Sequence, residues 1–344
     1  MDNPVNHRRR RILATTAAGV SLLGLANLAN AQISHAASAG KDAGSAAFGP
    51  IQQIDAGVLN VGYADVGPKN GPVVILLHGW PYDIYSYVDV APRLASAGYR
   101  VIVPYLRGFG PTHFLSAETP RNGQQVVTAV DILALMDALK IEQATLGGFD
   151  WGARTADTIA VLWPERVKAL VSVSGYLIGS QAANTKPLPP QAELAWWYQY
   201  YFATARGELG YTENCDAFNK LIWHLASPKW KFDDATFERT AASFRNPDHV
   251  AVVIHNYRWR LGLAQGEARY DDFEKRLATG PTIAVPTITL EGDANGAPHP
   301  APAAYADKFT GKYLHKTIAG GVGHNLPQEA PKAFTEAMLQ VMHL

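Results

Sequence analysis

Short apolar runs alternate with longer segments of helical spacing along most of this chain. Val-Val-Ile-Leu-Leu at residues 73–77 is one such run, and continuous apolar runs are typical of strands buried on both faces of a sheet. Strands separated by helices predict a mostly parallel sheet with helices on both of its faces. The predicted strands are residues 73–77, 101–103, 144–146, 169–173, 287–290 and 316–318, and the predicted helices are residues 88–97, 123–139, 154–163 and 331–342.

Two segments depart from this alternation. Residues 58–66 mix polar and apolar positions, as expected for an edge hairpin with one face in water. Residues 176–270 have mostly helical patterns and hold five of the 8 Trp and seven of the 15 Tyr. We therefore predict an α/β core of residues 51–175 and 271–344, with residues 176–270 inserted before the last strands as a helical lid. Such a lid would cover the carboxyl ends of the strands, where ligands bind in open α/β sheets, and its aromatic side chains would wall an apolar pocket.

The N-terminus has the pattern of an export signal. Four arginines at residues 8–11 precede an apolar run at residues 12–29, and Ala-Asn-Ala at residues 29–31 is a small-x-small cleavage site. The arginines resemble a twin-arginine signal, although an ordinary Sec signal stays open. The apolar run is short for a membrane span. We therefore predict that residues 1–31 are removed during export to the periplasm or cell exterior, and that residues 32–50 form a flexible leader.

Composition narrows the classes of function. The chain has 344 residues, 47% of them hydrophobic, which suits one large domain, and its 30 basic and 30 acidic residues balance, so nothing favours nucleic acid as a partner. Cys215 is the single cysteine, which excludes an intrachain disulfide and a thiolate metal cluster, and its sequence context does not suggest a catalytic thiol. No residues have the spacing of zinc ligands, and the sequence predicts neither a metal nor a cofactor.

Gly-Phe-Asp-Trp-Gly at residues 148–152 predicts a strand-to-helix elbow with an aspartate at its tip. In the usual Gly-x-Ser-x-Gly form, the glycines allow a sharp, strained turn that exposes a serine nucleophile. A carboxylate in that place can attack a carbon electrophile and form an ester intermediate. Asp150 is therefore predicted to open an epoxide or displace a halide, rather than to perform lipase-type acyl transfer.

Hydrolysis of that ester needs a histidine base and a carboxylate that orients it. Asp293 follows the predicted strand at residues 287–290, and His324 lies in a glycine-rich turn after the last predicted strand. With Asp150, they have the chain order nucleophile, acid, histidine. We therefore predict a triad in which His324 is the general base and Asp293 is the orienting acid.

The loop His-Gly-Trp-Pro at residues 78–81 follows the first buried strand. In this architecture the loop supplies one backbone N–H to an oxyanion hole, and the residue after the nucleophile supplies the other. The N–H groups of Trp80 and Trp151 are therefore predicted to stabilise the oxyanion that forms when the ester is cleaved. The side chain of His78 is interpreted as a structural hydrogen-bonding group.

From this loop to the terminal helix, the chain resembles α/β-hydrolases of the epoxide hydrolase group. Gly-x-Asp-Trp-Gly is shared by epoxide hydrolases and haloalkane dehalogenases, so the lid must separate the two. In soluble epoxide hydrolases two lid tyrosines hold and protonate the epoxide oxygen. The similar run Tyr-Gln-Tyr-Tyr-Phe at residues 198–202 implies Tyr198, with Tyr200 and Tyr201 as rivals, and Asn-Tyr-Arg-Trp at residues 256–259 implies Tyr257.

Proton-donating phenols suit this chemistry. Attack by Asp150 opens the ring from the back, and the leaving oxygen develops negative charge on the far side of the pocket. A phenol with an ordinary pKa near 10 can donate a hydrogen bond and then a proton to that oxygen. The leading hypothesis is therefore an epoxide hydrolase that produces vicinal diols from a small-molecule epoxide and water.

Two alternatives stay open. A dehalogenase would use the same Asp–His–Asp residues on an organohalide, with indole N–H groups of Trp151 and of Trp196 or Trp197 as halide donors. Arg154 stands four residues after the nucleophile, as in fluoroacetate dehalogenases, where an arginine at that spacing holds the substrate carboxylate; its other interpretation is a structural ion pair. Trp80, Trp151, Trp197 and Arg154 are the predicted pocket residues. A non-catalytic ligand-binding protein is the third hypothesis.

Overall fold

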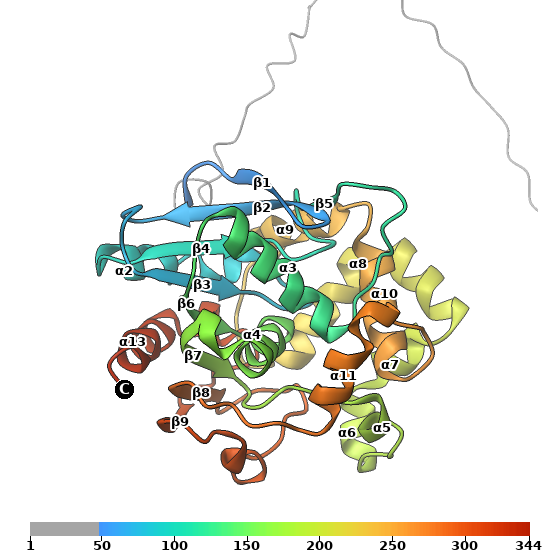
Figure 1. Ribbon diagram of the computed structural model, residues 1–344. Coiled ribbons are helices and arrows are strands. Elements are labelled where there is room, and N and C mark those ends of the chain that lie inside the picture. The colour runs from blue at the N-terminus through green and yellow to red at the C-terminus, as the bar shows by residue number, and fades with distance from the viewer. Residues whose placement is uncertain (1–47) are drawn as a thin grey trace, which may run out of the picture. The chain divides into compact units, whose positions relative to one another are not determined.

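A twisted sheet of nine strands runs through the protein (Figure 1). This computed structural model describes residues 48–344; the predicted export signal at residues 1–31 and all but the end of the predicted leader at residues 32–50 lie outside that range. The strands are β1 (Gln52–Ala56), β2 (Leu59–Val66), β3 (Val73–Leu77), β4 (Arg100–Pro104), β5 (His113–Phe114), β6 (Ala144–Gly148), β7 (Val167–Val173), β8 (Thr287–Gly292) and β9 (Tyr313–Ile318).

The strand order confirms the mostly parallel sheet. It runs β1-β2-β4-β3-β6-β7-β8-β9, with β5 beside β2. All pairings from β4 through β9 are parallel, whereas β1, β2 and β5 form an antiparallel edge. The apolar runs became buried inner strands because both faces are covered. Residues 58–66, which were expected to form a hairpin by themselves, form the single strand β2. The other strand of the hairpin is β1, whose residues Gln-Gln-Ile-Asp-Ala are only partly apolar.

Helices cover both faces of the sheet (Figure 1). On one face α3 (Gln125–Ala138) packs against α4 (Trp151–Leu162), and α4 also contacts β6 and β7. On the other face α13 (Pro331–Val341) contacts β7, β8 and α2 (Ala91–Ser96). The helix predicted at residues 154–163 is α4, which begins earlier, at Trp151, directly after the elbow. The spacing of apolar residues does not reveal this first turn.

The connection between β7 and β8 is helical, as the aromatic segment at residues 176–270 predicts. Its longest helix, α8, has a kink at Asn214. The helices of this connection are α5 (Gln181–Asn184), α6 (Pro190–Ala195), α7 (Trp197–Phe202), α8 (Ala205–Ala226), α9 (Asp234–Ala241), α10 (His249–Arg260) and α11 (Asp271–Ala278), and α11 packs on α4.

Short helical turns complete the fold. They are the 3₁₀ helices η1 (Ile84–Tyr87), η2 (Pro164–Arg166), η3 (Ala242–Arg245), η4 (Ala268–Tyr270), η5 (Pro302–Ala304) and η6 (Ala306–Lys308), together with α12 (Leu326–Glu329). The helix predicted at residues 88–97 is α2, which is shorter than expected because a turn that follows η1 occupies residues 88–90. In the part of the chain described, no helix is both long enough and apolar enough to cross a membrane.

Strand register brings distant loops together at one edge of the sheet. Leu77 at the end of β3 pairs with Gly148 at the end of β6, so the loop of residues 78–81 lies beside Asp150. Val173 of β7 pairs with Leu290 of β8, and Gly292 of β8 pairs with Ile318 of β9. The segments that carry the predicted triad therefore all leave the sheet at its carboxyl edge.

Candidate active site

Asp150 lies at the tip of a strained elbow between β6 and α4. Its backbone has φ 52° and ψ −124°, a conformation that residues with a side chain rarely adopt. Position 152 has room only for glycine, because a Cβ on Gly152 would lie 1.9 Å from the carbonyl oxygen of Leu77. The Asp150 carboxylate forms no capping hydrogen bond to α4 and is left free to face the pocket.

The two oxygens of Asp150 have different partners. Oδ1 accepts a hydrogen bond from the backbone N–H of Trp80 at 2.8 Å, whereas Oδ2 lies 3.4 Å from Nε2 of His324. Burial acts to raise the pKa of Asp150, but His324, the charge of Arg154 and the N–H of Trp151 together outweigh it and lower that pKa. The carboxylate is therefore ionised at neutral pH, as a nucleophile requires.

The Nδ1 of His324 faces an amide rather than a carboxylate. It lies 3.2 Å from Oδ1 of Asn295, an oxygen that also accepts the N–H of Ala297 at 2.9 Å. The amide nitrogen of Asn295 donates to Oε1 of Glu291 at 2.8 Å and to Oγ of Ser174 at 3.2 Å. These partners fix which end of the amide faces His324, and they assign the imidazole proton to Nδ1. Nε2 is then the ring nitrogen that faces Asp150.

Asp293 does not reach His324, which corrects the prediction of an orienting acid. Its exposed carboxylate accepts hydrogen bonds from the backbone N–H groups of Gly320, Gly321 and Val322 at 2.8–3.0 Å. Asp293 precedes Asn295 by two positions, and its side chain faces the glycine-rich turn. Asp293 thus holds the backbone of the turn that carries His324, while Asn295 contacts the imidazole.

The Asn295→Ala variant is expected to lose about 10²-fold in kcat with little change in KM, because a misplaced catalytic group costs roughly that much. The imidazole would lose its only side-chain contact at Nδ1 among the hydrogen bonds of the described residues. Steady-state kinetics of this variant, of Asp293→Ala and of the exposed control Asn70→Ala would check it. A larger loss in Asp293→Ala than in Asn295→Ala would restore the sequence prediction.

Asp293 also gives a prediction for stability against pH. Three N–H donors hold its pKa below the ordinary value of 3.8. A lowered folded-state pKa contributes stability above the ordinary value and loses it as the pH falls through the folded value. The melting temperature of Asp293→Ala should therefore lie below that of the native protein near neutral pH, and the gap should narrow below about pH 4. A gap that widens in acid would contradict this role.

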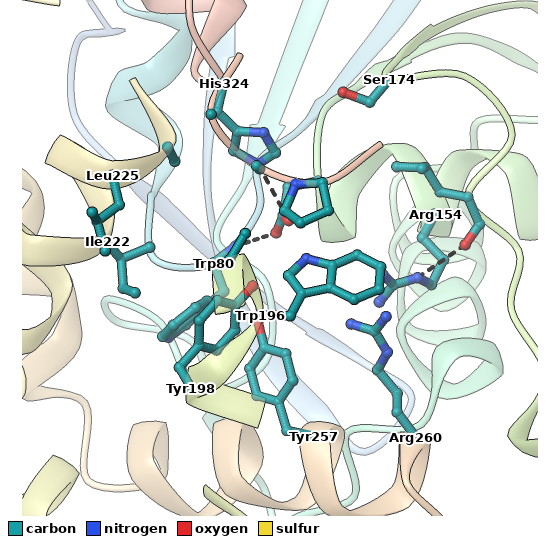
Figure 2. A pocket seen from close by; sticks show the side chains of 17 residues that line it. Trp80, Arg154, Ser174, Trp196, Tyr198, Ile222, Leu225, Tyr257, Arg260 and His324 are labelled. Atoms are coloured by element: carbon teal, nitrogen blue, oxygen red, sulfur yellow. Dashed lines mark hydrogen bonds and ion pairs between the residues drawn. The ribbon is translucent and has the colours of Figure 1, made fainter. Parts of the chain in front are cut away.

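The structure brings both predicted lid tyrosines to the pocket of Asp150 (Figure 2). Tyr198 comes from α7 and Tyr257 from α10, and their ring centroids are 5.4 Å apart. Burial, and then the charge of Asp150, raises the pKa of Tyr198 to about 12, and burial raises the pKa of Tyr257 well above its ordinary value. Both phenols therefore keep their protons at neutral pH and can act as donors.

The rival tyrosines lie elsewhere. Tyr200 is exposed and donates a hydrogen bond to Glu193, whereas the ring of Tyr201 stacks on Phe218 at 6.0 Å. Neither residue lines the pocket that holds Asp150. In the geometry of α7, only Tyr198 from this run faces the nucleophile.

The pocket itself has an empty volume of about 750 Å³. Trp80 and Arg154 line it as predicted, but Trp197 does not: its ring packs against Phe218 and Tyr201, and the neighbouring Trp196 takes its place. Trp151 is buried beside the pocket, with its ring centroid 6.0 Å from that of Tyr257, and its Nε1 has no hydrogen-bond partner in the described part of the chain. Trp196 lies at the junction between α6 and α7, so helical spacing could not show which of the two indoles reaches the pocket.

Asn295 and Arg260 are site residues that the sequence did not predict. Asn295 follows β8 just as Asp293 does, but a carboxylate was expected there. Arg260, the last residue of α10, lines the pocket beside Arg154, and nothing in the sequence linked these two helices. Arg154 itself is in the pocket, where its Nε donates to the carbonyl of Leu177 at 3.1 Å.

Other candidate groups lie outside the reaction centre. His78 is fully buried, and its Nε2 accepts the N–H of Leu106 at 3.1 Å, consistent with a structural group. Burial raises the pKa of the Cys215 thiol to about 11, away from the pocket. Within residues 48–344, no group of three or more His, Cys, Asp or Glu side chains could hold a metal ion.

Comparison with known proteins gives the family. Residues 72–219 match the family model described as the alpha/beta hydrolase fold. The crystal structure of a candidate epoxide hydrolase from Klebsiella pneumoniae is 66% identical, with a TM-score of 0.86, and covers 88% of this chain and 100% of that one.

Two of the curated relatives match over shorter stretches. Epoxide hydrolase B of Mycobacterium tuberculosis is 37% identical over 157 residues, which are 42% of this chain and 44% of the relative. A haloalkane dehalogenase of Mycobacterium marinum is 33% identical over 131 residues, 37% of this chain and 42% of the relative. The chain thus spans less than half the length of either curated relative, but all of the crystallised one. It belongs to the α/β-hydrolase family, among the epoxide hydrolase-like proteins.

Proposed function

We propose that this protein is a hydrolase that opens epoxides to vicinal diols through an ester on Asp150. The observation that carries the proposal is the pair of protonated phenols, Tyr198 and Tyr257, in one pocket with an ionised carboxylate. Halide displacement has no use for a proton donor, whereas an epoxide oxygen needs one as its C–O bond breaks.

In the first step, Oδ2 of Asp150 attacks an epoxide carbon, because Oδ1 is already held by the N–H of Trp80. The C–O bond of the ring breaks, and the oxygen takes a proton from Tyr198 or Tyr257. Asp150 is then an ester of the opened substrate, with Oδ1 as its carbonyl oxygen.

In the second step, Nε2 of His324 removes a proton from water, which attacks the Cγ of Asp150. The N–H groups of Trp80 and Trp151 stabilise the oxyanion that develops on Oδ1. Collapse of this intermediate breaks its bond to the substrate oxygen, which takes the proton from His324 and leaves as a hydroxyl group of the diol. The new carboxyl group of Asp150 gives its proton to the tyrosinate left by the first step, which restores both the carboxylate and the phenol. Asn295 orients the imidazole throughout, backed by Glu291.

A dehalogenase is the second candidate, and one observation favours it. The buried indole Nε1 of Trp151 lacks a partner within residues 48–344, as a halide donor would before its ligand arrives. Trp196 lines the same pocket as Asp150 and could supply a second indole.

A small activity panel on the purified protein separates these functions. It contains styrene oxide, an epoxide that carries a carboxylate, an alkyl bromide and fluoroacetate, with diol and halide both measured. Diol from either epoxide supports the proposal. Halide release without diol would replace it by the dehalogenase, and no product from any substrate would favour a non-catalytic binding protein.

A further inference from the structure

Two arginines from different parts of the fold meet in the active-site pocket. Arg154 lies in the first turn of α4, and Arg260 is the last residue of α10 in the helical connection. Both line the pocket of Asp150, and both line an adjoining cavity of about 300 Å³. Figure 2 shows their guanidinium groups facing each other on one side of the pocket, with Ile222 and Leu225 on the other side.

Among the residues described, neither guanidinium forms a direct ion pair. Within residues 48–344, no carboxylate forms an ion pair with Arg154 or Arg260. Arg154 donates to a backbone carbonyl, and the guanidinium of Arg260 lies 5.7 Å from the ring centroid of Trp196 and 5.8 Å from that of Tyr257. These contacts orient the two groups and leave N–H donors free.

Two acidic side chains near the two arginines have other roles. Asp150 is the nucleophile. Asp157, one turn after Arg154 on α4, accepts the N–H of Leu177 at 2.8 Å, and burial raises its pKa to about 7. Burial, and then the charge of Arg260, lowers the pKa of Arg154 to about 10, so Arg154 still carries its charge at neutral pH. Two like charges in a site that partly excludes water raise the free energy of the folded protein unless an anion binds between them.

We propose that Arg154 and Arg260 bind a carboxylate on the substrate, so that the protein acts on epoxides with an acidic group. The inference rests on the proposed function. Planar guanidinium groups match the geometry of a carboxylate and can hold it through paired hydrogen bonds. The two arginines also screen that carboxylate from the like charge of Asp150, while Ile222 and Leu225 contact the apolar part of the substrate.

Binding of an unreactive acid tests the site without turnover. By calorimetry, butanoate should bind the native protein about 10- to 100-fold more tightly than its neutral isostere butanamide, the range expected for hydrogen bonds to a charged group. Arg260→Met should remove this difference, and Arg260→Lys should keep part of it. Arg245→Met, which changes an exposed arginine paired with Asp216, is the matched control and should behave as the native protein.

Equal binding of butanoate and butanamide, or no measurable binding of butanoate, would overturn the inference. The same holds if Arg260→Met keeps the preference for the acid. Because Arg260 is only half-buried at a helix end, its substitution should leave the fold intact, and melting temperatures would show this.

Kinetics then separate this inference from the proposed function. A terminal-epoxide carboxylic acid and its primary amide are compared, and kcat/KM should be about 10- to 100-fold higher for the acid, mainly through KM. Arg260→Met should lower kcat/KM for the acid alone. Equal values for acid and amide would overturn the inference and leave epoxide opening in place. If neither is opened, the proposed function fails, and the binding experiment still decides the carboxylate site.

Discussion

The His324→Gln variant, mixed with an epoxide substrate, should become heavier by the mass of one substrate molecule. Attack by Asp150 does not need the imidazole, whereas release of the ester needs a base on water. Loss of a general base slows such a step about 10²- to 10⁴-fold, so the ester should accumulate. Mass spectrometry of the intact protein, followed by peptide mapping, should locate the added mass on Asp150.

Two variants control this experiment. Asp150→Ala removes the nucleophile and should show no added mass and no turnover. His343→Gln changes an exposed histidine near the C-terminus and should turn over substrate as the native protein does. Normal diol formation by His324→Gln would contradict the assignment of His324 as base, and a mass shift that persists in Asp150→Ala would contradict the assignment of the nucleophile.

Replacing both lid phenols should abolish epoxide opening. In the Tyr198→Phe/Tyr257→Phe variant, no side chain remains to protonate the ring oxygen, and we expect a loss of at least about 10³-fold in kcat. Removing two hydroxyl groups leaves the ring packing around Trp80 in place, where each ring centroid lies 5.2 Å from that of the indole. The measurements are diol formation and a circular dichroism melt.

Neighbouring tyrosines supply the matched control. Tyr200→Phe/Tyr201→Phe removes the same two atoms from α7 residues outside the pocket, and its activity should equal that of the native protein. If the double lid variant still opens epoxides, the phenols are not the donors. If it loses epoxide opening but still releases halide from an organohalide, the shared nucleophile is confirmed and the phenols are specific to epoxides.

Local signals made most of the fold predictable. Continuous apolar runs identify the buried strands β3, β6 and β7 because both sides of the sheet exclude water. The nucleophile and the histidine were found because a strained turn needs glycines at fixed offsets, as at Gly152, and because strand ends share one edge of the sheet.

The remaining site residues depend on where side chains point after folding. Asp293 and Asn295 follow the same strand, and only the path of the loop decides which of them faces His324. Trp196 lies between α6 and α7 and Trp197 begins α7, and the path of the chain at this junction decides which of them reaches the pocket. Arg260 and Arg154 are far apart in the sequence and meet only in the folded protein, where both line the same pocket.

Helix α10 carries both Tyr257 and Arg260, three residues apart. Residues at this spacing lie one above the other on the same helix face, with Cβ atoms about 5–6 Å apart. If the phenol holds the epoxide oxygen and the guanidinium holds the carboxylate, one rigid helix fixes the distance between these two parts of the substrate. Substrates would then be sorted by the number of bonds between ring and acid, and moving the arginine by a full turn would shift the preferred chain length.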